Sequence, residues 1–193
     1  MVGLRESEVS KITHKKILIL AQNVIFIVLS VLIAFFIRIP LIPAMPFLTL
    51  EFSDVPVLIS SILYGYSSGI CVLFLSLLLR LMLFSSTGFI GLTIRLTSIF
   101  LVFAVYFFKK NTLNFVSRIL LFILFLVLCV LIKIPLNYLS WLYLFKIPKD
   151  LILPLMFSYV IPFNILKISI NCVFALALAK PCEKLLIRIF KTI

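Results

Sequence analysis

Apolar runs long enough to cross a lipid bilayer follow one another along most of this 193-residue chain, of which 64% is hydrophobic. Ordinary soluble domains are closer to half apolar, and a soluble fold of this size could not bury so much apolar surface. Inside a bilayer each segment must satisfy its own backbone polar groups, so long apolar runs indicate membrane-spanning helices. The sequence therefore predicts an all-α membrane protein.

Six spans account for the alternation of apolar runs and turn residues. They cover about residues 17–37, 55–66, 69–84, 90–108, 114–134 and 157–179. Small residues form the turns at 65–69 and 85–91, and a long external connection is expected from Pro135 to Pro154. Because there is no linker or low-complexity segment, we expect residues 1–193 to form a single integral membrane domain.

Basic side chains are placed beside the spans rather than along one continuous surface. Eleven of the eighteen Lys and Arg residues fall into three clusters: Arg5, Lys11, Lys15 and Lys16; Lys109, Lys110 and Arg118; Lys180, Lys184, Arg188 and Lys191. Cytoplasmic loops of membrane proteins are enriched in Lys and Arg, and six spans put all three clusters on that side. We therefore expect both termini to be cytoplasmic and the net charge of +12 to reflect topology rather than a nucleic-acid partner.

Catalytic and metal-binding motifs are missing from the sequence. The four cysteines form no CxxC pair, and His14 is the only histidine, which argues against a metal site or a histidine base. There is no P-loop, dinucleotide fingerprint, His-Glu-x-x-His or Gly-x-Ser-x-Gly motif. We expect no enzymatic activity and no cofactor, so active transport by this chain would need a partner ATPase or an ion gradient.

Two carboxylates precede the second span, close to membrane depth where a charge is costly. Asp54 can cap the helix that begins there and meet the positive end of its dipole. Glu51 has no such role and could pair with Lys167, Arg80 or Arg95. Arg80 is close enough to the outer end of its span to reach water by snorkelling. For Arg95, snorkelling and ligand contact both stay open.

The last span carries polar side chains on one helical face. Asn164 and Lys167 are three residues apart, and Asn171 follows four residues later. Amide groups and an ammonium would suit a polar ligand with carbonyl groups, or an anion. The alternatives are a salt bridge between helices and a snorkelling lysine. Asn137, after Pro135, is either a ligand contact or a turn residue.

Taken together, these segments resemble the substrate-binding S-components of energy-coupling factor (ECF) vitamin transporters, and within them the riboflavin-specific branch. The matching pieces, in the family's order, are residues 47–56, the turn 65–69, residues 85–88 with Gly91, Leu136-Asn137, and Phe163-Asn164-x-x-Lys167. The resemblance implies a six-helix protein in a prokaryotic cell membrane that binds one vitamin at its extracellular side. It also implies docking on an ECF module, which consists of a transmembrane coupling subunit and two ABC ATPases.

The resemblance also implies the residues of the site. Those that match the family's flavin contacts are Asn137, Asn164 and Lys167. The segments that would cover the ligand are 47–54, with Leu48, Glu51 and Asp54, and 85–91, with Thr87 and Gly88. The coupling helices of the module would meet the face of the first span that carries Ser30 and Ala34, because small residues permit close approach.

Some positions depart from the family's pattern, and they concern the substrate. Arg95 stands where the family usually has an asparagine, and Ser76 and Leu77 replace a common Lys-Asn or Lys-Asp pair. Arg95 could favour a more anionic ligand, such as a flavin phosphate or a vitamin carboxylate. We therefore expect riboflavin uptake. The alternatives are an S-component for another vitamin, a membrane-embedded lipid-modifying enzyme with Glu51 or Asp54 as base, and an assembly subunit without a ligand.

Overall fold

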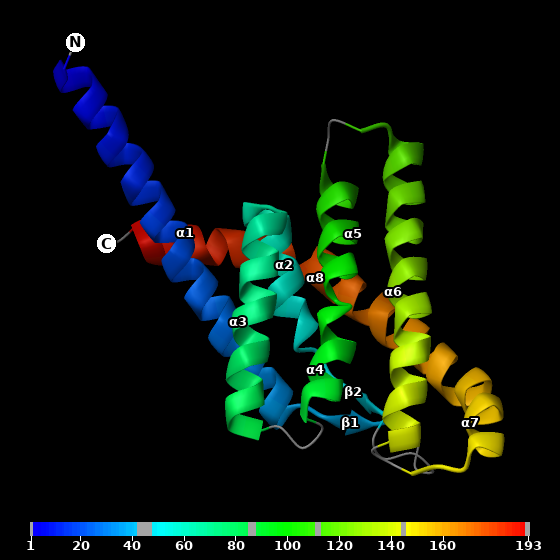
Figure 1. The fold of residues 1–193 in the computed structure, drawn as a ribbon. Helices are drawn as coiled ribbons and strands as arrows, with labels where there is room; N and C mark the ends of the chain where they lie inside the picture. The colour runs from blue at the N-terminus through cyan, green and yellow to red at the C-terminus, as the bar shows by residue number, and fades with distance from the viewer. Residues whose placement is uncertain (1, 42–47, 85–87, 111–112, 144–145, 192–193) are drawn as a thin grey trace.

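Helices make up almost all of the computed structural model, which describes residues 2–41, 48–84, 88–110, 113–143 and 146–191. The elements in chain order are α1 (Val2–Phe36), β1 (Ile39–Pro40), β2 (Thr49–Leu50), α2 (Asp54–Tyr64), α3 (Tyr66–Phe84), α4 (Gly88–Leu96), α5 (Ile99–Lys109), α6 (Phe115–Tyr143), α7 (Lys149–Leu155), the π-helical turn η1 (Met156–Val160) and α8 (Ile161–Lys191) (Figure 1). The predicted helical class is confirmed, with one short hairpin added to it.

Within the described residues, four helical stretches are long and apolar enough to cross a membrane. They are Lys16–Phe36, Tyr66–Leu83, Phe115–Tyr143 and Lys149–Ile189. Helix α2 is apolar but has only 11 residues, and α4 and α5 have 9 and 11 residues. The helices thus agree with a polytopic membrane protein, whereas the count of six spans and the cytoplasmic termini stay predictions.

The two ends of the helix bundle carry different elements (Figure 1). The start of α1, the turn between α2 and α3 and the end of α5 lie at one end, whereas β1, β2, α4 and α7 lie at the other. The two strands pair antiparallel, with Ile39 opposite Leu50 and Pro40 opposite Thr49. This pairing holds the polar segment that precedes α2 against the end of α1.

The predicted span at 90–108 is two helices that are separated at Thr97 and Ser98. Thr97 Oγ1 donates a hydrogen bond to the Ile94 carbonyl at 2.6 Å, and the Ser98 N–H donates to the Arg95 carbonyl at 2.9 Å. Hydroxyl groups that bond to nearby carbonyls compete with regular helical bonding. The helix therefore breaks here, and Arg95 lies in the last turn of α4.

Helix α6 continues through Pro135, where the sequence predicted that a span ends. A proline removes one helical hydrogen bond and costs about 3 kcal/mol in a helix interior. Beyond it, the Asn137 amide donates to the Lys133 carbonyl at 2.8 Å, and Trp141 is buried. Burial of one large apolar side chain stabilises by about 1.5–3 kcal/mol. Tertiary packing thus offsets the proline, and the prediction of a connection beginning at Pro135 is wrong.

The predicted last span, 157–179, is also extended at both ends. Helix α7, η1 and α8 form one helical path from Lys149 to Lys191. The wider π-helical turn ends two residues before Pro162, which has no N–H to continue regular helical bonding. A proline near the start of α8 therefore changes the pitch of the path without ending it.

The main hydrophobic core contains buried side chains of α2, α3, α5 and α8, among them Leu58, Val72, Leu101 and Cys172. Gly69 lies where α3 meets α2 and α5. A Cβ atom at Gly69 would lie 2.7 Å from the Ser61 Cβ and 2.9 Å from a Val102 methyl group. The first turn of α3 therefore requires a residue without a side chain.

Gly69→Ala should accordingly lower the melting temperature of the purified protein in detergent. Overpacking a tight contact costs about 1–3 kcal/mol, which corresponds to a loss of about 2–12 °C for a chain of this size. Ser67→Ala, at an exposed position on the same helix, is the matched control and should melt like the native protein. Equal melting temperatures for the two variants would contradict the close approach at Gly69.

Candidate ligand-binding site

A cavity of about 170 Å³ lies at the end of the bundle that carries β2 and α4. Its large apolar lining residues are Leu48, Ile94, Trp141 and Phe163. The other lining residues are Thr49, Glu51, Asp54, Gly91, Arg95, Ser98, Lys133, Asn137, Ser140, Asn164 and Lys167. Ligand sites usually combine apolar walls with a small number of polar groups. This cavity has the apolar walls but an unusually high share of charged groups.

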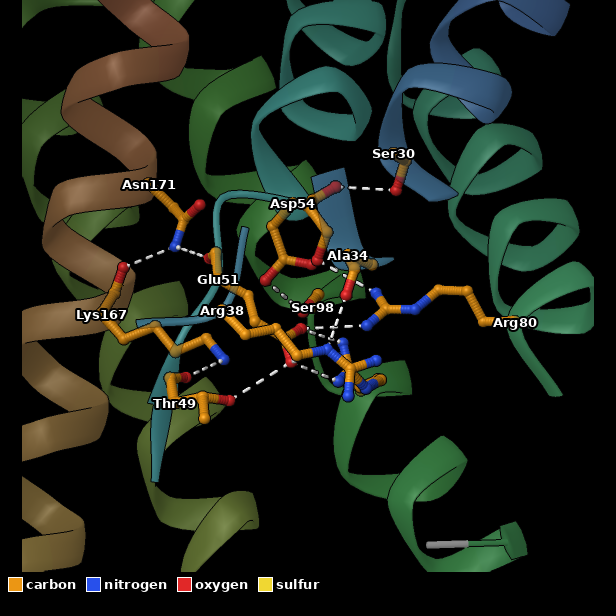
Figure 2. Close-up of polar contacts among 12 residues, drawn as sticks. Ser30, Ala34, Arg38, Thr49, Glu51, Asp54, Arg80, Ser98, Lys167 and Asn171 are labelled. Atoms are coloured by element: carbon orange, nitrogen blue, oxygen red, sulfur yellow. Dashed lines mark hydrogen bonds and ion pairs between the residues drawn. The ribbon is translucent and has the colours of Figure 1, made fainter. Parts of the chain in front are cut away.

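Glu51, buried beside the cavity, is held by several cations (Figure 2). Its carboxylate accepts two hydrogen bonds from Arg95, at 2.7 and 3.0 Å, and one from Arg80 at 2.9 Å. Arg38 Nε lies 3.8 Å from the same carboxylate. Burial raises the pKa of Glu51, but Arg95, Lys167 and Arg80 lower it by more, so this pKa lies well below its usual value. Glu51 is therefore ionised at neutral pH.

The partners of Glu51 come from separate parts of the chain. Arg38 follows α1, Arg80 lies on α3 and Arg95 lies in the last turn of α4. The prediction that Arg80 snorkels to water is wrong, because its side chain is only 10% exposed and also donates to the Ser53 hydroxyl at 3.0 Å. A single carboxylate thus ties the hairpin to α3 and α4.

Asn164, Lys167 and Asn171 lie along one side of α8, as their spacing predicted. The Lys167 ammonium donates to the Thr49 carbonyl at 3.2 Å. The Asn171 amide donates to the Glu51 carbonyl at 3.2 Å and to the Lys167 carbonyl at 2.8 Å (Figure 2). Asn164 and Lys167 also line the cavity. Helix α8 therefore fixes the backbone of the hairpin and presents two polar side chains to the cavity.

Asp54 begins α2 but makes no capping hydrogen bond. The N-cap residue is Ser53, whose side chain makes no capping bond either. Asp54 instead accepts a hydrogen bond from the Ser98 hydroxyl at 3.2 Å (Figure 2). Its carboxylate still lies in the first helical turn, where the helix dipole favours a negative charge. The predicted capping hydrogen bond of Asp54 is thus wrong. Asp54 instead links α2 to the break between α4 and α5.

Seven of the nine predicted site residues line this one cavity: Leu48, Glu51, Asp54, Arg95, Asn137, Asn164 and Lys167. Gly88 is the first residue of α4, and Gly91 on the same helix lines the cavity. Thr87 lies outside the described residues. The structure therefore brings the predicted residues together, and their contact with a ligand stays a prediction.

Lys133 and Trp141 are lining residues that the sequence did not assign to the site. Lys133 is 6% exposed and lies at the end of the predicted fifth span, and Trp141 is 1% exposed and lies in the predicted connection from Pro135 to Pro154. The spacing of Lys133, Asn137 and Trp141 by four residues each is the signal that they share a helical face. The sequence does not reveal this face, because Pro135 predicts that the helix ends before Asn137.

Ser30 and Ala34 do not form an exposed docking face on α1. Each is 1% exposed. The Ser30 hydroxyl donates to the Ser53 carbonyl at 2.7 Å, and the Ala34 carbonyl accepts from Arg38 Nε at 2.6 Å (Figure 2). These two side chains are therefore buried within the chain itself, and a contact of the module with the first helix stays a prediction.

Comparison with known proteins agrees with this architecture. The model of the family "ECF transporter, substrate-specific component" matches residues 18–179. The riboflavin transporter RibU of Streptococcus thermophilus is 33% identical over an alignment of 184 positions, which covers 88% of this chain and 85% of that protein. The solved structure of the S component of a bacterial ECF transporter matches with a TM-score of 0.68 at 26% identity, over 87% of this chain and 96% of that one. The chain therefore belongs to the substrate-specific components of ECF transporters.

Proposed function

We propose that this chain takes up riboflavin, which it binds in the cavity beside β2 as the vitamin-binding subunit of an ECF importer. The observation that carries the proposal is the convergence of Asn137, Asn164 and Lys167 on one cavity with Leu48 and Trp141 in its walls. Apolar and aromatic walls suit a flat ring system, and amide and ammonium groups suit its carbonyls and ring nitrogens. The 33% identity to a riboflavin transporter supports this choice of ligand.

The size of the cavity bears on how such a ligand would enter. Its volume of about 170 Å³ is below the roughly 300–1,000 Å³ that is usual for ligand pockets. A three-ring flavin therefore requires the walls to separate. The ion pair of Arg95 with Glu51 holds α4 to the rest of the cavity wall. Just after α4, the Ser98 hydroxyl donates a hydrogen bond to Asp54. Movement of α4 away from the cavity would have to break these two contacts.

Energy for uptake would come from the ECF module, since the sequence has no ATPase motif of its own. In this proposal the protein resides in the plasma membrane of a prokaryote and meets a coupling subunit there. Because Ser30 and Ala34 are buried, a contact through α1 would use its exposed stripe instead. That stripe includes Val24, Val28 and Leu32, which are 57%, 46% and 45% exposed.

The alternative of a lipid-modifying enzyme gains no support from the two carboxylates. Glu51 is bonded to Arg80 and Arg95 and has a lowered pKa, both of which make it a poor proton acceptor. Asp54 accepts a hydrogen bond from Ser98. The geometry thus favours a structural role for Glu51 and a binding role for the cavity.

Titration with riboflavin should quench the fluorescence of Trp141, which is the single tryptophan of the chain. Trp141 lines the cavity, so a flavin bound there lies beside it and should quench its fluorescence strongly. Thiamine, a vitamin without a flavin ring, is the matched ligand, and free tryptophan amide corrects for light absorbed by the flavin. Saturable quenching by riboflavin only is the expected result.

The variant Trp141→Phe separates the reporter from the binding event. It should abolish the tryptophan signal, while the loss of riboflavin's own fluorescence on binding is retained. Equal responses to riboflavin and thiamine, or no response to either in the native protein, would refute riboflavin binding at this cavity.

A further inference from the structure

The helical path that ends the chain is longer than a membrane crossing requires. The apolar stretch Lys149–Ile189 has 41 residues, whereas about 20 residues cross the hydrocarbon core of a bilayer. At a rise of about 1.5 Å per residue, such a path is about 60 Å long, which is roughly twice the thickness of that core. An average tilt of about 20° takes up little of this excess. Part of the path is therefore expected to lie along the membrane surface or outside the membrane.

The C-terminal part of α8 has the direction of a surface helix. Figure 1 shows it, in red, running across the direction of α5 and α6, at the end of the bundle that also holds the start of α1. Pro181 lies within α8 and removes one helical hydrogen bond, which is a common cause of a bend. Leu186 is only 5% exposed and belongs to the main hydrophobic core. This part of the helix is therefore held against the bundle while it runs across it.

Basic side chains form a stripe along this part of α8. Residues 180–191 include four basic residues and one acidic residue, Glu183. Lys180, Lys184 and Arg188 follow one another at intervals of four residues, so they share one side of the helix, and all three are exposed. No ion pair among the described residues involves Lys180 or Lys184. The stripe is therefore suited to an anionic surface outside the chain.

Exposed apolar side chains lie beside this basic stripe. Leu185 and Ile189 are 59% and 45% exposed and, being four residues apart, share another side of the helix. Hydrocarbon does not suit the basic stripe, and water does not suit the apolar side. The bilayer interface offers both anionic headgroups and acyl chains, and helices with one basic and one apolar side bind there. A membrane is favoured over an acidic protein surface because the preceding apolar part of α8 already brings this segment to the bilayer.

We propose that residues 180–191 of α8 form an interfacial helix that binds the headgroups of anionic phospholipids, at the end of the bundle opposite the cavity. The ammonium groups of Lys180 and Lys184 meet the lipid phosphates, because long lysine side chains reach headgroup level while their stems follow apolar surface. Leu185 and Ile189 lie against the outer part of the acyl chains. This surface differs from the cavity in place and in ligand, so the inference is independent of the proposed function.

Native mass spectrometry of the full-length protein in detergent, with phosphatidylglycerol or phosphatidylcholine added, tests the inference. The native protein should bind phosphatidylglycerol about tenfold more tightly than phosphatidylcholine. The double variant Lys180→Gln/Lys184→Gln should bind phosphatidylglycerol about tenfold more weakly than the native protein, since each basic residue near an anionic surface adds to the affinity. The matched control Lys16→Gln/Lys109→Gln removes the same charge from exposed positions of α1 and α5 and should bind this lipid as the native protein does.

Thermal melting provides a second measurement on the same proteins. Without lipid, the native protein and both double variants should melt alike, because all four lysines are exposed. Added phosphatidylglycerol should raise the melting temperature of the native protein and of the Lys16/Lys109 control, and it should raise that of the Lys180/Lys184 variant much less.

Three results would overturn the inference. Equal affinity of the native protein for the two lipids would leave an acidic protein surface as the partner of the basic stripe. Equal losses of affinity in the two double variants would show that the lipid responds to the total charge of the protein rather than to α8. Displacement of phosphatidylglycerol by an equal concentration of inorganic phosphate would assign the stripe to a free anion.

Discussion

Glu51→Gln should lower the melting temperature of the protein by about 6–20 °C. Removal of one partner from a buried ion pair costs about 3–5 kcal/mol, and each kcal/mol corresponds to about 2–4 °C for a chain of this length. The substitution retains the shape of the side chain but leaves Arg80 and Arg95 without their carboxylate. Differential scanning fluorimetry in detergent measures the effect. Glu183→Gln, at an exposed position of α8, is the matched control and should melt within about 2 °C of the native protein.

The pH dependence gives this prediction a second readout. Arg95, Lys167 and Arg80 lower the pKa of Glu51 despite its burial. For a carboxylate with a lowered folded-state pKa, the stabilisation is complete above the unfolded-state pKa of about 4.3 and is lost as the pH falls below it. The difference between native and Glu51→Gln proteins should therefore be constant from neutral pH to about pH 5, and it should shrink in stronger acid.

A double variant identifies the source of the loss. In Glu51→Gln most of the cost should come from the unpaired guanidinium of Arg80, whose side chain is only 10% exposed. Arg80→Met in the same chain removes that charge, so the double variant should recover several degrees relative to Glu51→Gln alone. Melting of Glu51→Gln at the native temperature would show that the ion pairs contribute nothing.

The helical class and one side of the site could be predicted because their signals are local. Apolar runs of membrane length need no knowledge of the fold. Asn164, Lys167 and Asn171 could be placed on one side of a helix, because residues three and four apart are neighbours in any helix. The structure confirms that these side chains share one side of α8. It also shows that Lys167 and Asn171 donate hydrogen bonds to the backbone carbonyls of Thr49 and Glu51.

Other features depend on contacts between distant segments and could not be predicted. Glu51 meets Arg80 and Arg95, which are 29 and 44 residues away in the chain. The sequence offered three candidate partners for Glu51 and no means of choosing among them. Lys133 was missed because a proline two residues later indicated a helix end, whereas the burial of Trp141 keeps the helix intact. Tertiary packing overrode the local signal in both cases.

Lys167→Met should weaken flavin binding by about 10- to 150-fold while lowering the melting temperature by only about 2–4 °C. A hydrogen bond to a charged group is worth about 1.5–3 kcal/mol, which is the basis of the change in affinity. The stability change is small because the loss of the bond to the Thr49 carbonyl is partly offset when an apolar side chain replaces a partly buried ammonium. Isothermal titration calorimetry and thermal melting measure the two effects on the same sample. Lys180→Met, at an exposed position of α8, should change neither.

Asn171→Leu should produce the opposite pattern, and this contrast decides whether Lys167 binds a ligand or only supports the hairpin. Asn171 is fully buried and donates to the carbonyls of Glu51 and Lys167. Loss of these bonds should cost about 1–3 kcal/mol of stability, and it should reduce affinity less than Lys167→Met does. If the two variants lose stability and affinity in the same proportion, Lys167 acts through the hairpin rather than through the ligand. A larger affinity loss per degree of melting for Lys167→Met assigns its ammonium to the ligand.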